Sequence, residues 1–178
     1  MTYHCLKNMH FFFPVWPRLY WRKKKFFWTA ALGESCKYDF DRDGMKAWNK
    51  LVGVSKSINP RKNSIRFVWR WNKDEAKFQI AVFVEYKKEF KKTVYQIGSV
   101  IPGAPFTIGF DFDGSNVVAI MNEQSIILPH VPFTGLTFRL NPYFGGQAPA
   151  PHKVQLHLAK DKNESQGIVY IHLNNMLC

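Results

Sequence analysis

The feature that most constrains the fold is the alternation of large apolar side chains with mostly polar ones along residues 64–71 and 77–86. The first stretch places four large apolar side chains on one face: Ile65, Phe67, Trp69 and Trp71. Alternation with a period of two is the pattern of a β-strand that buries one face. The polar segment NKDEA between the two stretches suits a turn. The sequence therefore predicts an antiparallel hairpin that supplies a large part of a hydrophobic core.

The same period recurs along most of the chain, whereas long helical periodicity is almost absent. We expect strands near 26–32, 47–55, 64–71, 76–86, 91–98, 105–112, 115–121, 124–128, 136–144, 152–158 and 168–173. Turn-forming pairs such as Asp113-Gly114 and Gly145-Gly146 separate them. Many short strands at this spacing predict an all-β sandwich or barrel. A chain of 178 residues has room for one such domain.

Positive charge is concentrated near the beginning of the sequence. The chain carries a net charge of +12, and residues 1–33 contain six basic residues and no acidic one. We expect residues 1–25 to form a basic, poorly ordered arm, 26–158 a β-sandwich domain, and 159–178 a tail or an extra strand. Such an arm can contact phosphate, anionic polysaccharide or acidic lipid headgroups, or it can act as a solubilising tail.

The three cysteines, Cys5, Cys36 and Cys178, predict no disulfide framework. They fit a reducing compartment best, and a secreted bacterial protein with few cysteines is the alternative. The apolar run HFFFPVWP is far shorter than the roughly 20 residues of a membrane helix. Its main basic cluster follows the apolar run, the reverse of a secretory signal. We therefore expect neither a signal peptide nor a transmembrane segment, and the localisation stays open. The first 17 residues could precede the functional start.

Residues 106–129, FTIGFDFDGSNVVAIMNEQSIILP, resemble the three-strand meander of concanavalin A-like jelly rolls. Asn122-Glu123 stands where that family places an Asn-Gly turn. The YFGG segment followed by V-x-L-x-L is similar to the end of several bacterial jelly rolls, including polysaccharide lyases. The resemblance covers roughly residues 26–158. It implies an antiparallel jelly-roll β-sandwich in which one sheet is concave and presents a ligand groove.

The polar face of several expected strands supplies candidate ligand-binding residues. Arginine suits a carboxylate or sulfate through paired hydrogen bonds, and tyrosine offers a flat apolar surface with one polar group. We expect an acidic polysaccharide or glycan as the ligand. The candidate binding residues are Arg66, Arg70, Arg139, Asn141, Tyr143, Gln155 and His157. The alternative is an ordinary solvated sheet face, because alternation alone produces such sets.

The segment QLH at 155–157 resembles the Gln-x-His of alginate-type lyases. The resemblance implies acid, base and carboxylate-neutralising roles for Tyr143, His157, Gln155 and Arg139. The arginine-rich strand and the lysine-bearing tyrosine strand of those lyases are not matched, and here Gln-x-His follows the tyrosine segment. We therefore expect a non-catalytic binding module. A polysaccharide lyase acting on a uronate polymer and a structural protein of a surface or virion assembly are the alternatives.

We expect no cofactor, and calcium is the metal for which the sequence offers candidate ligands. Asp39, Asp41 and Asp43 match the first half of a calcium loop, but Lys50 stands where the loop needs a bidentate glutamate. These carboxylates could hold a structural ion, or they could form an aspartate-rich turn. A protein assembly partner also fits the basic arm. Nucleic acid ranks below carbohydrate, because the aromatic residues between arginines fall on the core face.

Overall fold

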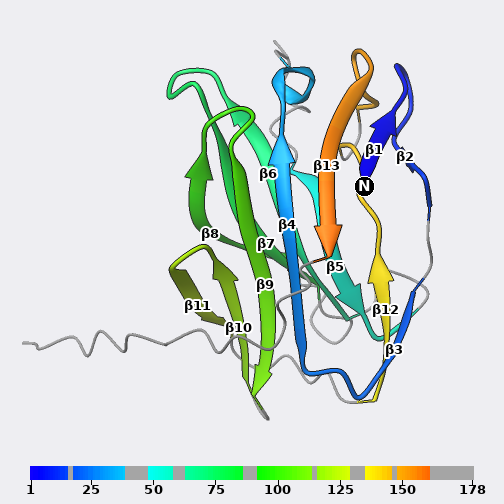
Figure 1. Cartoon of the computed structure of the whole chain (residues 1–178), viewed down its shortest axis with the longest axis vertical. Coiled ribbons are helices and arrows are strands. Elements are labelled where there is room, and N and C mark those ends of the chain that lie inside the picture. Colours follow the sequence, from blue (N-terminus) through cyan, green and yellow to red (C-terminus); the bar gives the residue numbers. More distant parts are fainter. Residues whose placement is uncertain are drawn as a thin grey trace, which may run out of the picture.

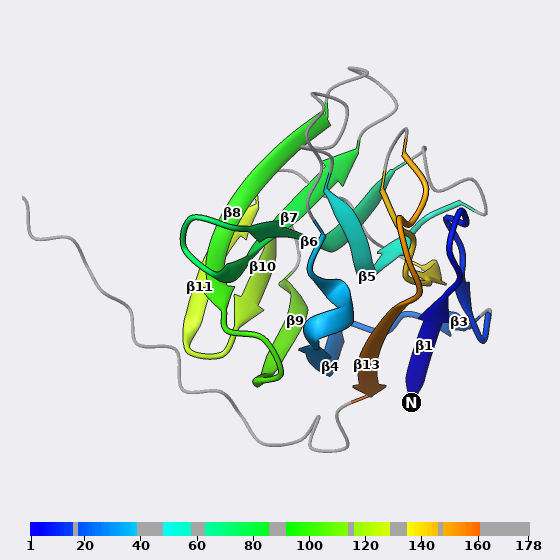
Figure 2. The same cartoon turned by 90° about the horizontal axis from the view of Figure 1, so that it is seen from above.

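The computed structural model describes residues 1–15, 18–38, 48–57, 63–85, 92–113, 116–128, 135–145 and 148–160. Thirteen strands in this part of the chain form two antiparallel sheets that pack face to face as a jelly-roll β-sandwich (Figure 1). Seen from above, β9, β4, β13 and β1 make one layer, and β8, β7, β6 and β5 make the other (Figure 2). The expected fold class is therefore confirmed. Among the described residues, no helix is both long and apolar enough to cross a membrane.

The seven-stranded sheet has the order β11-β10-β9-β4-β13-β1-β2. Its strands are β1 (Thr2–Cys5), β2 (Phe12–Phe13), β4 (Lys25–Leu32), β9 (Pro105–Asp113), β10 (Asn116–Met121), β11 (Gln124–Leu128) and β13 (Val154–Lys160). Strands β9, β10 and β11 form the expected meander. Asn122 opens its second turn at a φ of 51°, a left-handed conformation that asparagine tolerates.

The six-stranded sheet has the order β3-β12-β5-β6-β7-β8. Its strands are β3 (Leu19–Trp21), β5 (Asn49–Ser55), β6 (Ser64–Asn72), β7 (Lys77–Glu85), β8 (Lys92–Val100) and β12 (Leu136–Leu140). The hairpin expected from the strongest alternation is β6 paired with β7. A short 3-10 helix, η1 (Glu34–Cys36), follows β4.

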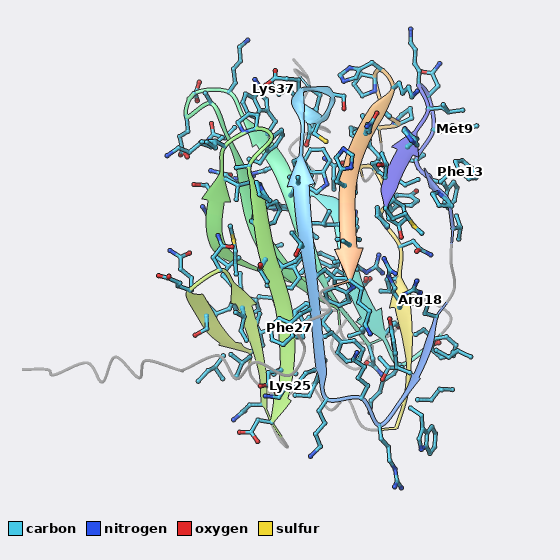
Figure 3. All side chains as sticks on the ribbon, in the orientation of Figure 1. Met9, Phe13, Arg18, Lys25, Phe27 and Lys37 are labelled. Atoms are coloured by element: carbon cyan, nitrogen blue, oxygen red, sulfur yellow. The ribbon has the colours of Figure 1, made fainter. Side chains whose placement is uncertain are left out.

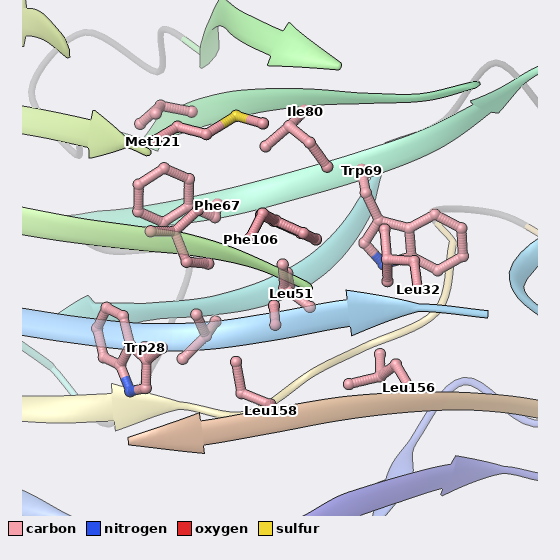
Figure 4. Close-up of a cluster of buried hydrophobic side chains, with 14 of the residues drawn as sticks. Trp28, Leu32, Leu51, Phe67, Trp69, Ile80, Phe106, Met121, Leu156 and Leu158 are labelled. Carbon is pink, nitrogen blue, oxygen red and sulfur yellow. The ribbon is translucent and has the colours of Figure 1, made fainter. Parts of the chain in front are cut away.

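Large apolar side chains from both sheets fill the space between the layers (Figure 4). Phe67 of β6 and Phe110 of β9 stack across the sandwich with ring centroids 4.5 Å apart. Trp28 and Leu156 from one sheet and Trp69 from the other are also fully buried. Burial of this apolar area is the main source of the sandwich's stability. The polar side chains between these positions are left to face outward.

The N-terminal residues differ most from the sequence prediction. We expected 1–25 to be a poorly ordered arm, but β1 lies between β13 and β2 inside the seven-stranded sheet. Tyr3 and Cys5 are fully buried, with Tyr3 opposite Leu156 in the sheet. Burial of alternate β1 side chains explains why this segment is a strand, and a four-residue strand is too short for its alternation to stand out in the sequence.

Several sequence predictions lie outside the described residues. They include the candidate calcium ligands Asp39, Asp41 and Asp43, the expected strand at 168–173, and the tail beyond Lys160.

Candidate functional site

The outward face of the six-stranded sheet carries a group of cationic and aromatic side chains. We call this group the Trp48–Tyr143 cluster. Its members are Trp48, Lys50, Arg70, Gln79 and Tyr143. Strands β5, β6 and β7 and the segment after β12 bring them together.

Arg70 and its neighbours form one half of the cluster. The Arg70 Nε donates a hydrogen bond of 2.6 Å to the Gln79 Oε1, its partner position on β7. The guanidinium carbon lies 4.5 Å from the centre of the Trp48 ring. The Gln79 amide and the Trp48 ring hold this guanidinium in place. Its side chain therefore loses little conformational entropy when it binds an anion.

Lys50 and Tyr143 form the other half. Their backbones pair, with Lys50 N donating to Tyr143 O at 2.8 Å and Tyr143 N donating to Lys50 O at 3.0 Å. The Lys50 ammonium lies 5.8 Å from the centre of the Tyr143 ring and donates a 3.0 Å hydrogen bond to Gly145 O. Because Trp48 and Lys50 are two residues apart on one chain, their side chains share the outward face.

The segment before β2 completes the surroundings of Tyr143. The His10 ring stacks on the Tyr143 ring with centroids 5.3 Å apart, and Phe11 meets the same ring edge-on. His10 Nδ1 lies 2.9 Å from Phe144 O. Since a carbonyl oxygen only accepts, Nδ1 carries the proton in the neutral ring and Nε2 keeps the lone pair. The imidazole can therefore accept a proton beside Tyr143.

A glycine corner sets the position of Tyr143. Gly145 has a φ of 65°, and a Cβ placed on it would lie 2.3 Å from Ala148 O. The Gly145 amide donates to the side-chain oxygen of Asn49, which is itself buried at the start of β5. This corner turns Phe144 into the core and leaves Tyr143 on the outward face. Gly145, the first glycine of the pair noted in the sequence, thus shapes the edge of the cluster.

Arg66 lies on the same outward face but is buried. Its side chain covers Gly53 of β5, where any Cβ would collide with the β6 backbone. Burial lowers the pKa of the Arg66 guanidinium to about 10, and the nearby Glu85 carboxylate opposes that shift. Arg66 therefore stays cationic at neutral pH. It contributes positive electrostatic potential to this face, but its buried side chain is not an accessible binding group.

Arg139 does not lie on this face, which corrects the sequence prediction. It pairs with Val54, so its side chain points into the sandwich, where its Nη2 donates a 3.0 Å hydrogen bond to the Tyr3 hydroxyl. The apolar Phe138 and Leu140 face outward instead, opposite Ser55 and Gly53. In β12 the charged side chain therefore faces the core and the apolar side chains face outward, the reverse of the usual pattern. Asn141 is half-buried, with its Oδ1 atom enclosed.

Gln155 and His157 lie on the opposite side of the molecule. Both face outward from β13 in the seven-stranded sheet, as alternation predicted, and Val154, Leu156 and Leu158 point inward. The His157 Nδ1 lies 3.0 Å from the Thr2 hydroxyl. The four residues expected for lyase chemistry are therefore not brought together. Tyr143 faces outward beside the six-stranded sheet, Arg139 points into the sandwich, and Gln155 and His157 face outward from the seven-stranded sheet. Of the seven expected groove residues, Arg66, Arg70 and Tyr143 share one face.

Sequence reasoning missed Trp48, Lys50, Gln79 and His10. The pairing of β5 with β6 shifts between Lys50 and Val52, so Leu51 is an extra residue in the strand. Strict alternation counted back from Val52 and Val54 would have placed Lys50 in the core. A β-bulge reverses the alternation on one side of it, and this one turns Lys50 outward. The presence of a lysine at a position expected in the core was the sequence signal that could have indicated this bulge.

The described residues contain no group of three His, Cys, Asp or Glu side chains that could hold a metal ion. The calcium prediction stays untested, since its ligands are not among them.

No family model and no curated protein matches this sequence. Solved structures do match in fold. One is the catalytic domain of an endo-1,3-β-glucanase (laminarinase) from Thermotoga petrophila, with a TM-score of 0.53, 10% identity, and coverage of 88% of this chain and 73% of that one. Another is a family 16 glycoside hydrolase endo-glucanase from Bacteroides ovatus, with a TM-score of 0.52, 10% identity, and coverage of 88% and 77%.

An alginate lyase from Klebsiella pneumoniae matches with a TM-score of 0.49 and 12% identity over 83% of this chain. This chain spans 60% of the length of that lyase. The identities are low, so the likeness concerns the fold. The chain has the concanavalin A-like jelly-roll fold, as its sequence resemblance implied, and it shares this fold with the two glucanases.

Proposed function

We propose that the protein is a non-catalytic binding module that holds an acidic carbohydrate on the outward face of its six-stranded sheet. One observation carries the proposal: Lys50 and Arg70 flank the rings of Trp48 and Tyr143 on a single face. Aromatic rings can cover the apolar face of a sugar ring, and the two cations can bind its carboxylates or sulfates. Buried Arg66 reinforces the positive potential beneath them.

Binding of the full chain to a uronate polymer, measured by calorimetry or gel retardation, tests the proposal. A hydrogen bond to a charged group is worth about 1.5–3 kcal/mol, so Lys50→Gln or Arg70→Gln should weaken binding by about 10- to 100-fold. Tyr143→Ala should weaken it as well. Lys153→Gln is the matched control, because Lys153 is an exposed lysine next to the other sheet. Equal binding of neutral glucan, or no effect of the three cluster variants, would refute the proposal.

A uronate lyase is the second candidate, and the stacking of His10 on Tyr143 favours it. Removal of the sugar C5 proton and protonation of the leaving oxygen need a base and an acid, which histidine and tyrosine can supply. Cleavage would release unsaturated ends that absorb ultraviolet light. His10→Ala should abolish that product while leaving retention on the polymer intact. Retention without any unsaturated product from the parent protein supports the binding module.

A further inference from the structure

Exposed apolar side chains concentrate in the N-terminal segment. Among the described residues, eight of the twelve large exposed hydrophobic side chains precede residue 22: Met1, Leu6, Met9, Phe11, Phe13, Val15, Leu19 and Trp21. Trp21 is 69% exposed and Leu19 is 61% exposed. A ninth, Leu136, pairs directly with Trp21 across β3 and β12. A concentration of this kind on a folded domain indicates a contact surface.

The sheet order gathers these side chains along one side of the sandwich. β2 is the last strand of the seven-stranded sheet and β3 is the first strand of the six-stranded sheet. Both edges lie on the same side of the molecule (Figure 1). Met9 and Phe13 project from the β1–β2 end of this side, and Arg18 lies toward its β3 end (Figure 3). We call this side the β2–β3 edge.

Positive charge accompanies the apolar side chains. Arg18, Arg22, Lys23, Lys24 and Lys25 fall within eight residues of sequence, and residues 1–33 contain no acid. The Lys25 ammonium is offset by Asp111 at 2.9 Å. The Arg22 guanidinium lies 5.8 Å from the centre of the Trp21 ring, which places a cation directly beside an exposed aromatic side chain.

The partner of this edge must accept cations and aliphatic side chains together. A second copy of the edge would bring like charges into contact, which disfavours self-association. Single-stranded nucleic acid stacks on aromatic rings but offers no apolar surface for Val15, Leu19 or Leu136. A membrane interface accepts all three kinds of group, since tryptophan sits at the headgroup level, aliphatic side chains enter the acyl boundary, and basic residues bind anionic lipids.

We propose that the β2–β3 edge binds the protein peripherally to an anionic lipid surface. Trp21, Leu19 and Leu136 insert at the interface, and Arg18, Arg22 and Lys24 contact lipid phosphates. The carbohydrate site adjoins this edge, because the Phe11 ring contacts Tyr143. Leu19, Trp21, Arg18 and Arg22 are not members of the Trp48–Tyr143 cluster, so substitutions there can remove lipid binding without removing carbohydrate binding.

Flotation of the full chain with lipid vesicles tests this proposal. Vesicles of phosphatidylcholine with 30% phosphatidylserine, about one anionic lipid in three, should bind the protein at low salt at least about tenfold better than pure phosphatidylcholine. Trp21→Ser combined with Leu19→Ser should lower partitioning at least about tenfold through lost apolar insertion. Ile127→Ser is the matched control, because Ile127 is 67% exposed on β11 at the opposite edge of its sheet.

A second pair of variants tests the charges without touching an apolar side chain. Arg18→Gln combined with Arg22→Gln should lower partitioning about 25-fold at low salt, since each basic residue near the surface contributes about fivefold. Lys73→Gln combined with Lys77→Gln should leave it unchanged, because both lysines are exposed at the β6–β7 turn, several strands away from β3. Lys50→Gln should keep vesicle binding even where it abolishes carbohydrate binding, so the two proposals fail separately.

Three results would overturn the proposal. The first is equal partitioning into neutral and anionic vesicles, or into neither. The second is a dimer of the parent protein that the Trp21 and Leu19 substitutions convert to a monomer. The third is binding of single-stranded DNA or acidic polysaccharide that depends on Trp21 and Leu19 while vesicle binding does not.

Discussion

Substitution of Tyr3 tests whether the first residues are structural. Tyr3 is fully buried, faces Leu156 of β13, and accepts a 3.0 Å hydrogen bond from the Arg139 guanidinium across the sandwich. Tyr3→Phe removes only the hydroxyl, whereas Tyr3→Ala also removes the ring. The two variants therefore separate the hydrogen bond from the packing.

The structure sets the size of both effects. Arg139 is only 8% exposed, so loss of the Tyr3 hydroxyl leaves a buried cation without that acceptor. Hydrogen bonds to charged groups contribute about 1.5–3 kcal/mol, and Tyr3→Phe should lower the free energy of unfolding by that amount. Removal of a fully buried aromatic ring costs about 3–5 kcal/mol, so Tyr3→Ala should cost at least that much.

Urea unfolding measures these differences as shifts of the midpoint at an unchanged slope. Lys7→Ala is the control, because Lys7 is exposed in the same segment and its substitution should change the free energy by less than about 0.5 kcal/mol. If Tyr3→Ala also changed the free energy by less than about 0.5 kcal/mol, β1 would not belong to the folded sheet. A Tyr3→Phe variant as stable as the parent would exclude the Arg139 hydrogen bond as a stabilising contact.

Three further predictions concern close packing and titration. Gly53→Ala should lower the free energy of unfolding by about 3 kcal/mol, measured by urea unfolding, because the added Cβ would lie 2.1 Å from Ile65 O. Gly33→Ala is the control: a Cβ there would have no atom within 4 Å, so the free energy should change by less than about 0.5 kcal/mol. Burial raises the pKa of Cys5 to about 11 and of Cys36 to about 12, so a thiol reagent at pH 8 should react with two more thiols per chain in urea than in buffer. Burial likewise raises the pKa of the Tyr38 hydroxyl from 10 to about 12, which favours its neutral form in the folded state. This stabilisation is present below pH 10 and is lost as the pH rises to 12, so over that range the free energy of unfolding should fall by up to about 3 kcal/mol more in the parent than in Tyr38→Phe.

The sheets were predictable because their strands bury one face each. The expected strand at 124–128 coincides with β11, and those at 64–71 and 105–112 match β6 and β9 to within one residue. The β1, β2 and β3 strands were missed, since they have two to four residues each and prolines interrupt the segment. Strands this short leave too few alternating positions to separate a strand from an irregular arm.

The candidate site was predictable only in part, because face assignment assumes unbroken alternation and says nothing about which sheet a strand joins. Arg70 fell on the expected outward face. Arg139 did not, because β12 turns a charged residue inward toward Tyr3 and apolar residues outward. His157 has the expected outward orientation but lies on the other sheet from Arg70, since strand order is a long-range property that local pattern does not encode.

The position of β1 beside β13 has a consequence for how the chain acquires its structure. Tyr3 pairs with Leu156, and Leu158 N donates a 3.0 Å hydrogen bond to Met1 O. The strand partners of β1 are therefore more than 150 residues away in the sequence. During synthesis the seven-stranded sheet cannot close until β13 has left the ribosome, and high sequence separation of this kind slows folding. The same adjacency makes the molecule suited to circular permutation. A short linker from Lys160 to Met1 with new ends at Asn122-Glu123 would convert the latest pairing into a local hairpin and should speed folding without altering the sandwich.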